Sequence, residues 1–122
     1  MRRHPKPISL RLLAGSGDRA EMMRAAIMAA ADFAETIKWT NLLFSTQGPC
    51  IVIRAEEQPV ILALFRGKRL AHLDPRIKPS GKYELGNLIL DEPSPIDHVT
   101  IERIAAEAAR LNAVQGDPTA RL

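Results

Sequence analysis

Apolar residues recur at helical spacing near both ends of the chain and at strand spacing between them. After Gly15-Ser16-Gly17, Asp18 and Glu21 stand three residues apart, which is the arrangement of a capping box at a helix N-terminus. The apolar positions that follow are three or four residues apart: Met22, Ala25, Ala26, Ala29, Phe33 and Ile37. This spacing places them on one face and predicts an amphipathic helix over residues 19–37.

The middle of the chain contains short apolar runs separated by turn residues. The runs at 42–44, 50–54 and 60–65 predict three strands, with turns at 47–49 and 56–59. The short connection between the second and third strands predicts an antiparallel hairpin. The third strand is apolar on both faces, as in a central strand or a strand at an interface. A fourth strand is predicted over 83–90, where Gly86 permits a bulge or a close approach of another backbone segment.

The last helix has the clearest boundaries. Ser94 can cap it, Pro95 suits its first position, and Asp97 lies near the positive end of its dipole. Gly116 ends it. The stripe expected to be buried consists of Ile101, Ile104, Ala105, Ala108 and Leu111.

Two amphipathic helices can cover one face of a sheet, so the pattern predicts an α+β fold. We expect a two-layer sandwich, in which an N-terminal and a C-terminal helix pack on the same face of an antiparallel sheet. No repeat or linker divides the 122 residues, which is about the length of one domain. The domain is predicted to span residues 18–115, after a basic, loosely ordered leader at 1–17 and before a frayed tail at 116–122.

Composition narrows the class of protein. One Trp, one Tyr and three Phe offer no stacking platform for single-stranded nucleic acid, and neither helix is strongly basic, so no nucleic-acid partner is expected. The single Cys50 cannot form an internal disulfide and is expected to be a buried structural thiol in a reducing cytoplasm. No apolar run is long enough to span a membrane. We therefore expect a cytoplasmic protein without a membrane partner.

No catalytic motif or metal-ligand spacing is recognised. The histidines fall on separate segments: His4, His72 and His98. No Ser or Cys stands in a nucleophile elbow, and the adjacent Asp91 and Glu92 would point to opposite sides of a strand end. His72 and Asp74 could share a site if their loop folds back, but Asp74 more simply caps its own turn. Neither an enzymatic activity nor a cofactor is predicted.

The basic, turn-rich stretch over 66–82 is the most distinctive part of the chain. Its side chains could bind a small anionic ligand, while the Gly81 amide approaches a phosphate or carboxylate closely. The candidate residues are Arg66, Lys68, Arg69, Lys78, Gly81 and Lys82, with Arg76 adding charge. A net charge of +3 and a pI near 9.4 are compatible with this site. The prediction is a small binding or accessory protein.

A second hypothesis belongs to another class of function. The chain could be a non-catalytic interaction module that forms a homodimer, in which the uncovered sheet face or an edge strand packs against a second copy. The strand over 60–65 favours this hypothesis because both of its faces are apolar.

One ordered set of residues resembles the YdhG-like family of domains of unknown function. The order is Phe65-x-Gly67, Leu70, Asp74-Pro75, Gly81-Lys82-Tyr83, then Asp97 and an Ala-rich helix. Residues 35–39, Glu-Thr-Ile-Lys-Trp, are similar to the early segment of that family, whereas Thr40-Asn41 replace an expected turn with glycine and proline. The resemblance covers residues 19–112. It implies an antiparallel sheet with both helices packed against it, and no particular activity.

Some members of that family are described as frataxin-like iron chaperones, so the resemblance also implies iron as a candidate cargo. Iron would require carboxylates clustered on an exposed acidic face. The predicted first helix instead mixes acidic with basic residues: Asp18, Glu21, Asp32 and Glu35 with Arg19 and Arg24. Iron binding is therefore the least favoured of the three functions.

Overall fold

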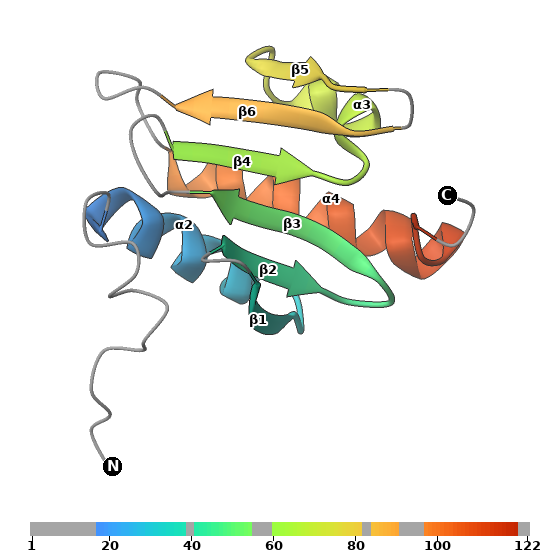
Figure 1. The fold of residues 1–122 in the computed structure, drawn as a ribbon, viewed down its shortest axis with the longest axis horizontal. Helices are drawn as coiled ribbons and strands as arrows, with labels where there is room; N and C mark the ends of the chain where they lie inside the picture. Colours follow the sequence, from blue (N-terminus) through green and yellow to red (C-terminus); the bar gives the residue numbers. More distant parts are fainter. Residues whose placement is uncertain (1–16, 39–40, 55–59, 82–83, 91–96, 120–122) are drawn as a thin grey trace.

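The computed structural model describes residues 17–38, 41–54, 60–81, 84–90 and 97–119. Their elements are α2 (Gly17–Ala30), β1 (Ala34–Lys38), β2 (Asn41–Ser45), β3 (Pro49–Arg54), β4 (Val60–Leu64), α3 (Gly67–Leu70), the 3-10 helix η2 (Ala71–Leu73), β5 (Ile77–Pro79), β6 (Gly86–Leu90) and α4 (His98–Gln115). The six strands form one antiparallel sheet in the order β1-β2-β3-β4-β6-β5, with α2 and α4 behind it (Figure 1). The predicted two-layer α+β sandwich is confirmed.

The core lies between the helices and one face of the sheet. Alternate residues of each central strand are buried there, and the antiparallel register aligns Ile53 of β3 with Leu62 of β4 and Leu62 with Leu88 of β6. The predicted strands, their hairpin pairing and the turn after β2 are confirmed, and Gln47 and Gly48 both have positive φ in that turn. The turn predicted at 56–59 lies outside the described residues.

The first helix is shorter than predicted. It ends at Ala30, and residues 34–37, which were expected to continue it, belong to β1 together with Lys38. Within β1, Glu35 pairs with Phe44 and Ile37 with Leu42 of β2. No glycine or proline marks this boundary, so local signals do not end the helix. The backbone groups of 34–38 instead find partners in β2, and the β-branched Thr36 and Ile37 suit a strand.

The buried face of α2 also differs from the predicted one. Met23, Ala26 and Ile27 are buried, whereas Ala25 and Ala29 are exposed. Alanine and methionine occur on nearly every side of this helix, so their spacing does not select one face. Packing against α4 and the sheet selects it.

The basic connection is more ordered than a loop, because it contains α3, η2 and β5. Gly67 at the start of α3 lies against Gly86 at the start of β6. A Cβ added to Gly86 would lie only 2.9 Å from the Gly67 Cα atom. The close approach predicted at Gly86 is therefore confirmed. Tyr83, predicted as the first residue of this strand, lies outside the described residues, as does Lys82.

The last helix is buried along the predicted stripe. Its N-cap is Asp97, whose Oδ1 accepts a hydrogen bond from the Val99 amide at 3.0 Å. The proposed cap at Ser94 and the first-turn position of Pro95 are outside the described residues. Gly116, with φ of 86°, ends the helix as predicted, and its amide donates to the Asn112 carbonyl.

The chain remains packed beyond the predicted domain boundary at residue 115. The Asp117 side chain lies so close to Gly48 that a Cβ there would be 2.7 Å from the Asp117 Cγ atom. The predicted leader lies outside the described residues except for Gly17, which opens α2. Within the described part of the chain, no helix combines the length and hydropathy that a membrane crossing requires.

Candidate functional site

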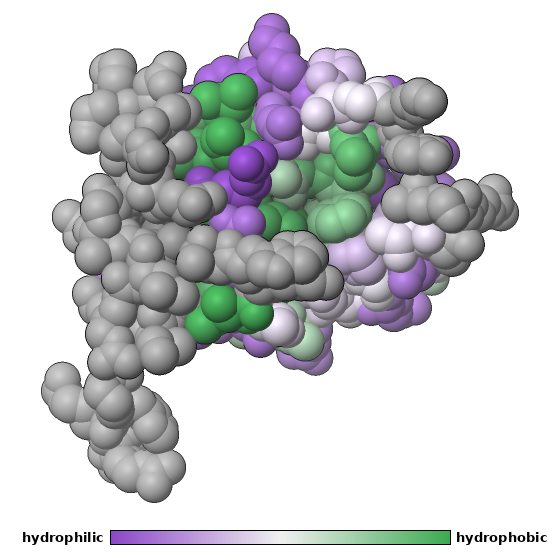
Figure 2. All heavy atoms as spheres, in the orientation of Figure 1, coloured by the Kyte–Doolittle hydropathy of each residue, from purple (hydrophilic) through white to green (hydrophobic). Residues whose placement is uncertain are grey.

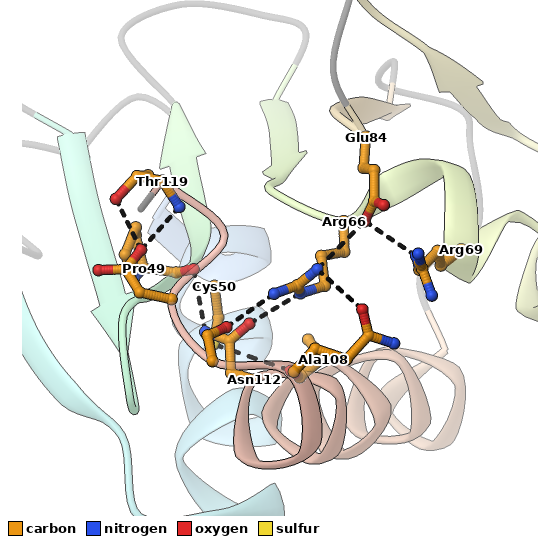
Figure 3. Close-up of polar contacts among 11 residues, drawn as sticks. Pro49, Cys50, Arg66, Arg69, Glu84, Ala108, Asn112 and Thr119 are labelled. Carbon is orange, nitrogen blue, oxygen red and sulfur yellow. Dashed lines mark hydrogen bonds and ion pairs between the residues drawn. The ribbon is translucent and has the colours of Figure 1, made fainter. Parts of the chain in front are cut away.

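Arg66, a predicted anion ligand, is instead a buried structural residue. It precedes α3 and is 7% exposed. Its Nε donates to Asn112 Oδ1 at 3.1 Å, and its terminal nitrogens donate to the Gly116 carbonyl at 2.7 Å and to Glu84 Oε1 at 3.2 Å. Figure 3 shows the Arg66 side chain reaching toward Asn112 on α4. Its guanidinium thus binds the C-terminal end of α4 rather than an external anion, which corrects the sequence expectation.

Asn112 extends this cluster to the turn between β2 and β3. Its Nδ2 lies 3.1 to 3.2 Å from the carbonyl oxygens of Thr46, Gly48 and Pro49, and 3.1 Å from Cys50 Sγ. One side chain that is 1% exposed therefore binds the hairpin turn with its amide and Arg66 with its oxygen. The predicted burial of Cys50 is confirmed, and burial raises the pKa of its thiol. A buried thiol of raised pKa is a poor nucleophile.

Arg69, another predicted ligand, shares a carboxylate with Arg66. Its Nε donates to Glu84 Oε1 at 2.9 Å, the same oxygen that Arg66 contacts (Figure 3). Hydrogen bonding by Arg69, and secondarily by Arg66, lowers the pKa of Glu84 below its ordinary value of 4.5. Because this carboxylate is ionised at neutral pH, it neutralises part of the positive charge of Arg66 and Arg69 that would otherwise attract an anion.

The Asp74 carboxylate is buried and bound to Arg76. Its oxygens accept from the Arg76 backbone amide at 2.9 Å and from Nη2 at 2.7 Å. The hydrogen bond from the Arg76 side chain is the main reason that the pKa of Asp74 is lowered. Asp74 caps its own turn, as expected, and its oxygens bind Arg76, so the structure gives no support to a site shared with His72.

The other predicted ligands are exposed or outside the described residues. Lys68 Nζ lies 3.4 Å from the Gly81 carbonyl oxygen, at an exposed position. Lys78 is exposed on the edge strand β5, and Gly81 has φ of 76° in the turn that follows. Lys82 is not described. Anion binding at this connection stays a prediction. Among its described cations, Lys68, Arg69 and Lys78 are exposed, and Arg69 is paired with Glu84.

Across residues 17–38, 41–54, 60–81, 84–90 and 97–119, no group of three or more His, Cys, Asp or Glu side chains is arranged to hold a metal ion. Glu35, one of the acidic residues considered for iron, lies on β1 and forms an ion pair with Arg24 of α2 at 2.6 Å. This carboxylate is thus neutralised between two elements.

The sheet face opposite the helices carries a group of apolar side chains that was not predicted from the sequence. Side chains that alternate with the buried ones point to this face. Neighbouring strands align Leu43, Val52, Ala63 and Asn87 in one row and Arg54, Ile61 and Ile89 in the next. We call Leu43, Val52, Ile61, Ala63 and Ile89 the outer apolar face. Figure 2 views the molecule from this side and shows hydrophobic residues in several patches, with strongly hydrophilic residues between them.

The edge of this face is polar. Exposed Arg54 follows Val52 on β3, and exposed Lys78 lies beside Asn87. Phe65 and Leu85 continue the alternation of β4 and β6 beyond the strand ends, and both are partly exposed. A signal for the surface was present in the sequence. The runs 42–44, 50–54, 60–65 and 83–90 all have apolar residues at alternate as well as consecutive positions, but only the strand order makes them neighbours.

The chain has no match among protein-family models, curated proteins or solved structures. The resemblance to the YdhG-like family therefore stays a prediction, and the function is argued from the chain itself.

Proposed function

We propose that this protein is a non-catalytic assembly module whose outer apolar face packs against the same face of a second copy. The observation that carries the proposal is the alignment of apolar side chains from four adjacent strands on the side of the sheet that none of the described helices covers. In a two-layer sandwich this side normally carries polar residues, because it faces water. Contiguous apolar surface with a polar edge is typical of protein interfaces.

A second copy suits this face because of where its apolar residues lie. Val52, Ile61 and Ala63 lie on β3 and β4, the two central strands of the six. A two-fold axis near them would place β3 of one copy over β4 of the other. The apolar residues of each copy would then pack against those of the other copy. Lys78, on an edge strand, would remain at the periphery, whereas Arg54 lies beside Ile61 at the end of β3 and would adjoin the contact.

The competing function, binding of a small anion, has weaker support. Arg66 and Arg69 both contact Glu84, and Arg76 contacts Asp74. Three of the cations in the basic connection thus already have carboxylate partners, and one of those cations is buried.

The test is Ile89→Asp. Ile89 is 45% exposed and its side chain points away from the core, so the domain should still fold. An ionised carboxylate at the contact would have to be desolvated without a partner. We expect the assembly to lose half its mass in native mass spectrometry and in size-exclusion chromatography with light scattering.

Val99→Asp is the matched control. Val99 is 60% exposed on α4, on the other side of the molecule, and receives the same change. It should leave the mass of the assembly unchanged. A wild-type protein that is monomeric at high micromolar concentration, or an assembly that Ile89→Asp does not affect, would contradict the proposed function.

A further inference from the structure

The two edges of the sheet differ in how they are protected. Edge strands expose unpaired backbone groups, and natural proteins shield them with short length, proline, charges or bulges. β5 is three residues long, ends in Pro79 and carries the exposed Lys78. β1 has five residues, contains no proline, and pairs with β2 in an unbroken register. Of the two edges, β1 is therefore the one suited to accept another strand.

β1, like β5, carries a lysine, which is its last residue Lys38, whereas its other charged residue, Glu35, is neutralised. Glu35 points to the helix side of the sheet, as does its strand neighbour Phe44. Both of its oxygens accept hydrogen bonds from Arg24, at 2.6 and 2.7 Å, and its side chain is 17% exposed. An inward-pointing charge would otherwise discourage strand addition at an edge. With Arg24 bound, Glu35 does not have that effect.

Two exposed apolar side chains accompany this edge. Ile37 of β1 is 38% exposed, and Met28 of α2 is 37% exposed. Met28 lies one helical turn after Arg24, so it is on the side of α2 that faces β1 rather than α4. No other described strand pairs with β1 on its outer side, so within the described part of the chain this edge offers both backbone groups and apolar surface from the neighbouring helix.

We infer that β1 pairs antiparallel with β1 of a second copy and joins two six-stranded sheets into one. A two-fold axis perpendicular to the sheet at Thr36 aligns Thr36 with Thr36 of the second copy, and Glu35 with its Ile37. Thr–Thr is a favourable cross-strand pair. The two Ile37 side chains become diagonal neighbours on the helix side. The second copy brings a preformed strand, so its pairing does not carry the ordering entropy of a flexible peptide.

This contact is separate from the proposed face-to-face contact and does not depend on it. The experiment is therefore made in the Ile89→Asp background, which removes the outer apolar face as a contact. We expect Ile89→Asp protein to be a dimer. Adding Thr36→Lys places two like charges opposite each other and should convert it to a monomer, whereas adding Thr36→Val should leave the dimer intact.

Mixing two variants tests the two-fold register itself. Thr36→Lys and Thr36→Glu, each in the Ile89→Asp background, should both be monomers alone and should form a 1:1 heterodimer when mixed, as seen by native mass spectrometry. Only an axis that brings the two copies of position 36 together explains this rescue.

The outcomes separate the two contacts. An Ile89→Asp protein that is already monomeric, or a dimer that tolerates Thr36→Lys, would overturn the edge contact. A wild-type dimer that Ile89→Asp does not change but Thr36→Lys dissolves would support the edge contact and contradict the proposed function.

Discussion

At the scale of single residues, Asn112 connects three parts of the chain that are distant in sequence. Its amide satisfies carbonyl groups of the β2–β3 turn, and its oxygen accepts from Arg66. Buried polar groups of this kind contribute modestly when paired but are costly when one partner is removed. The stability of the hairpin turn and of the C-terminus of α4 should therefore depend on this side chain.

We predict that Asn112→Ala lowers the free energy of unfolding by about 2–3 kcal/mol, because it removes the hydrogen bonds from the Asn112 amide to the turn carbonyls and leaves the buried Arg66 Nε without its Asn112 partner. Urea denaturation followed by circular dichroism measures the change. Arg103→Ala, at an exposed position of the same helix, should stay within about 0.5 kcal/mol of wild type. Equal effects of the two substitutions would contradict the structural role of Asn112.

The lowered pKa of Asp74 predicts how the stability of the protein responds to acid. Its pKa is lower in the folded protein than its ordinary value of 3.8, chiefly because the Arg76 side chain donates to it. Its contribution to stability is thus fully present above pH 3.8 and is lost as the pH falls through the folded pKa. Asp74→Asn should lower stability at pH 7 by about 1–2 kcal/mol and flatten the pH dependence below 4. Thermal denaturation from pH 7 to 2 tests this; an unchanged acid slope would count against it.

At the scale of elements, the contact of α3 with β6 depends on two glycines. A Cβ on Gly67 would meet the backbone of Gly86, which cannot move aside as a side chain can. The sequence indicated that Gly86 permits a close approach, but it could not indicate the partner. The partner is 19 positions away and becomes adjacent only when β4 and β6 pair, which places Gly86 opposite Leu64.

Gly67→Ala is expected to destabilise the protein by about 3 kcal/mol through this backbone overlap. Gly81→Ala is the control: its added Cβ would lie 4.0 Å from Leu85 Cδ1, an ordinary van der Waals contact, so only the positive φ of 76° opposes it, at about 1 kcal/mol. Denaturation midpoints of the two variants compare the effects. A Gly67→Ala protein as stable as Gly81→Ala would show that the two segments can separate at little cost.

The boundary between α2 and β1 could not be predicted from local signals in the sequence. Residues 31–38 contain no glycine or proline, and their apolar spacing also fits a helix. The ladder to β2 and the ion pair of Arg24 with Glu35 favour the strand. Both are contacts between segments, so no local pattern carries them. By contrast, the apolar part of the buried stripe of α4 was predicted in full, because its period is strong and Gly116 ends the helix, whereas the buried Asn112 was not predicted.

At the scale of the whole molecule, the strand order predicts how strongly the backbone amides of each strand are protected from hydrogen exchange. β3 and β4 are central and hold Ile51, Ile53 and Leu62 in the core, whereas β5 is a short edge strand. Amides of β3 and β4 should exchange only through global unfolding, and those of β5 through local opening, at least tenfold faster. Native-state hydrogen exchange measures both. Uniform protection across the sheet would contradict this ranking.

The same strand order changes the functional interpretation. The basic connection was predicted from its cations, but Glu84 and Asp74 bind three of them. The outer apolar face was visible only in part, as a strand with two apolar sides. Its extent is evident only when β2, β3, β4 and β6 are known to be neighbours. We therefore propose this face, rather than the basic connection, as the functional site.

The sequence by itself determined the fold class, the central strands, their hairpin pairing and the last helix, because periodicity and turn residues are local properties. Tertiary structure alone decided that residues 34–38 form an edge strand, which face of α2 is buried and that Arg66 is a structural residue. Each of these depends on which segments become neighbours across the sheet or between the layers. A side chain's partners, and thus its charge state and role, are set by those contacts and not by its position along the chain.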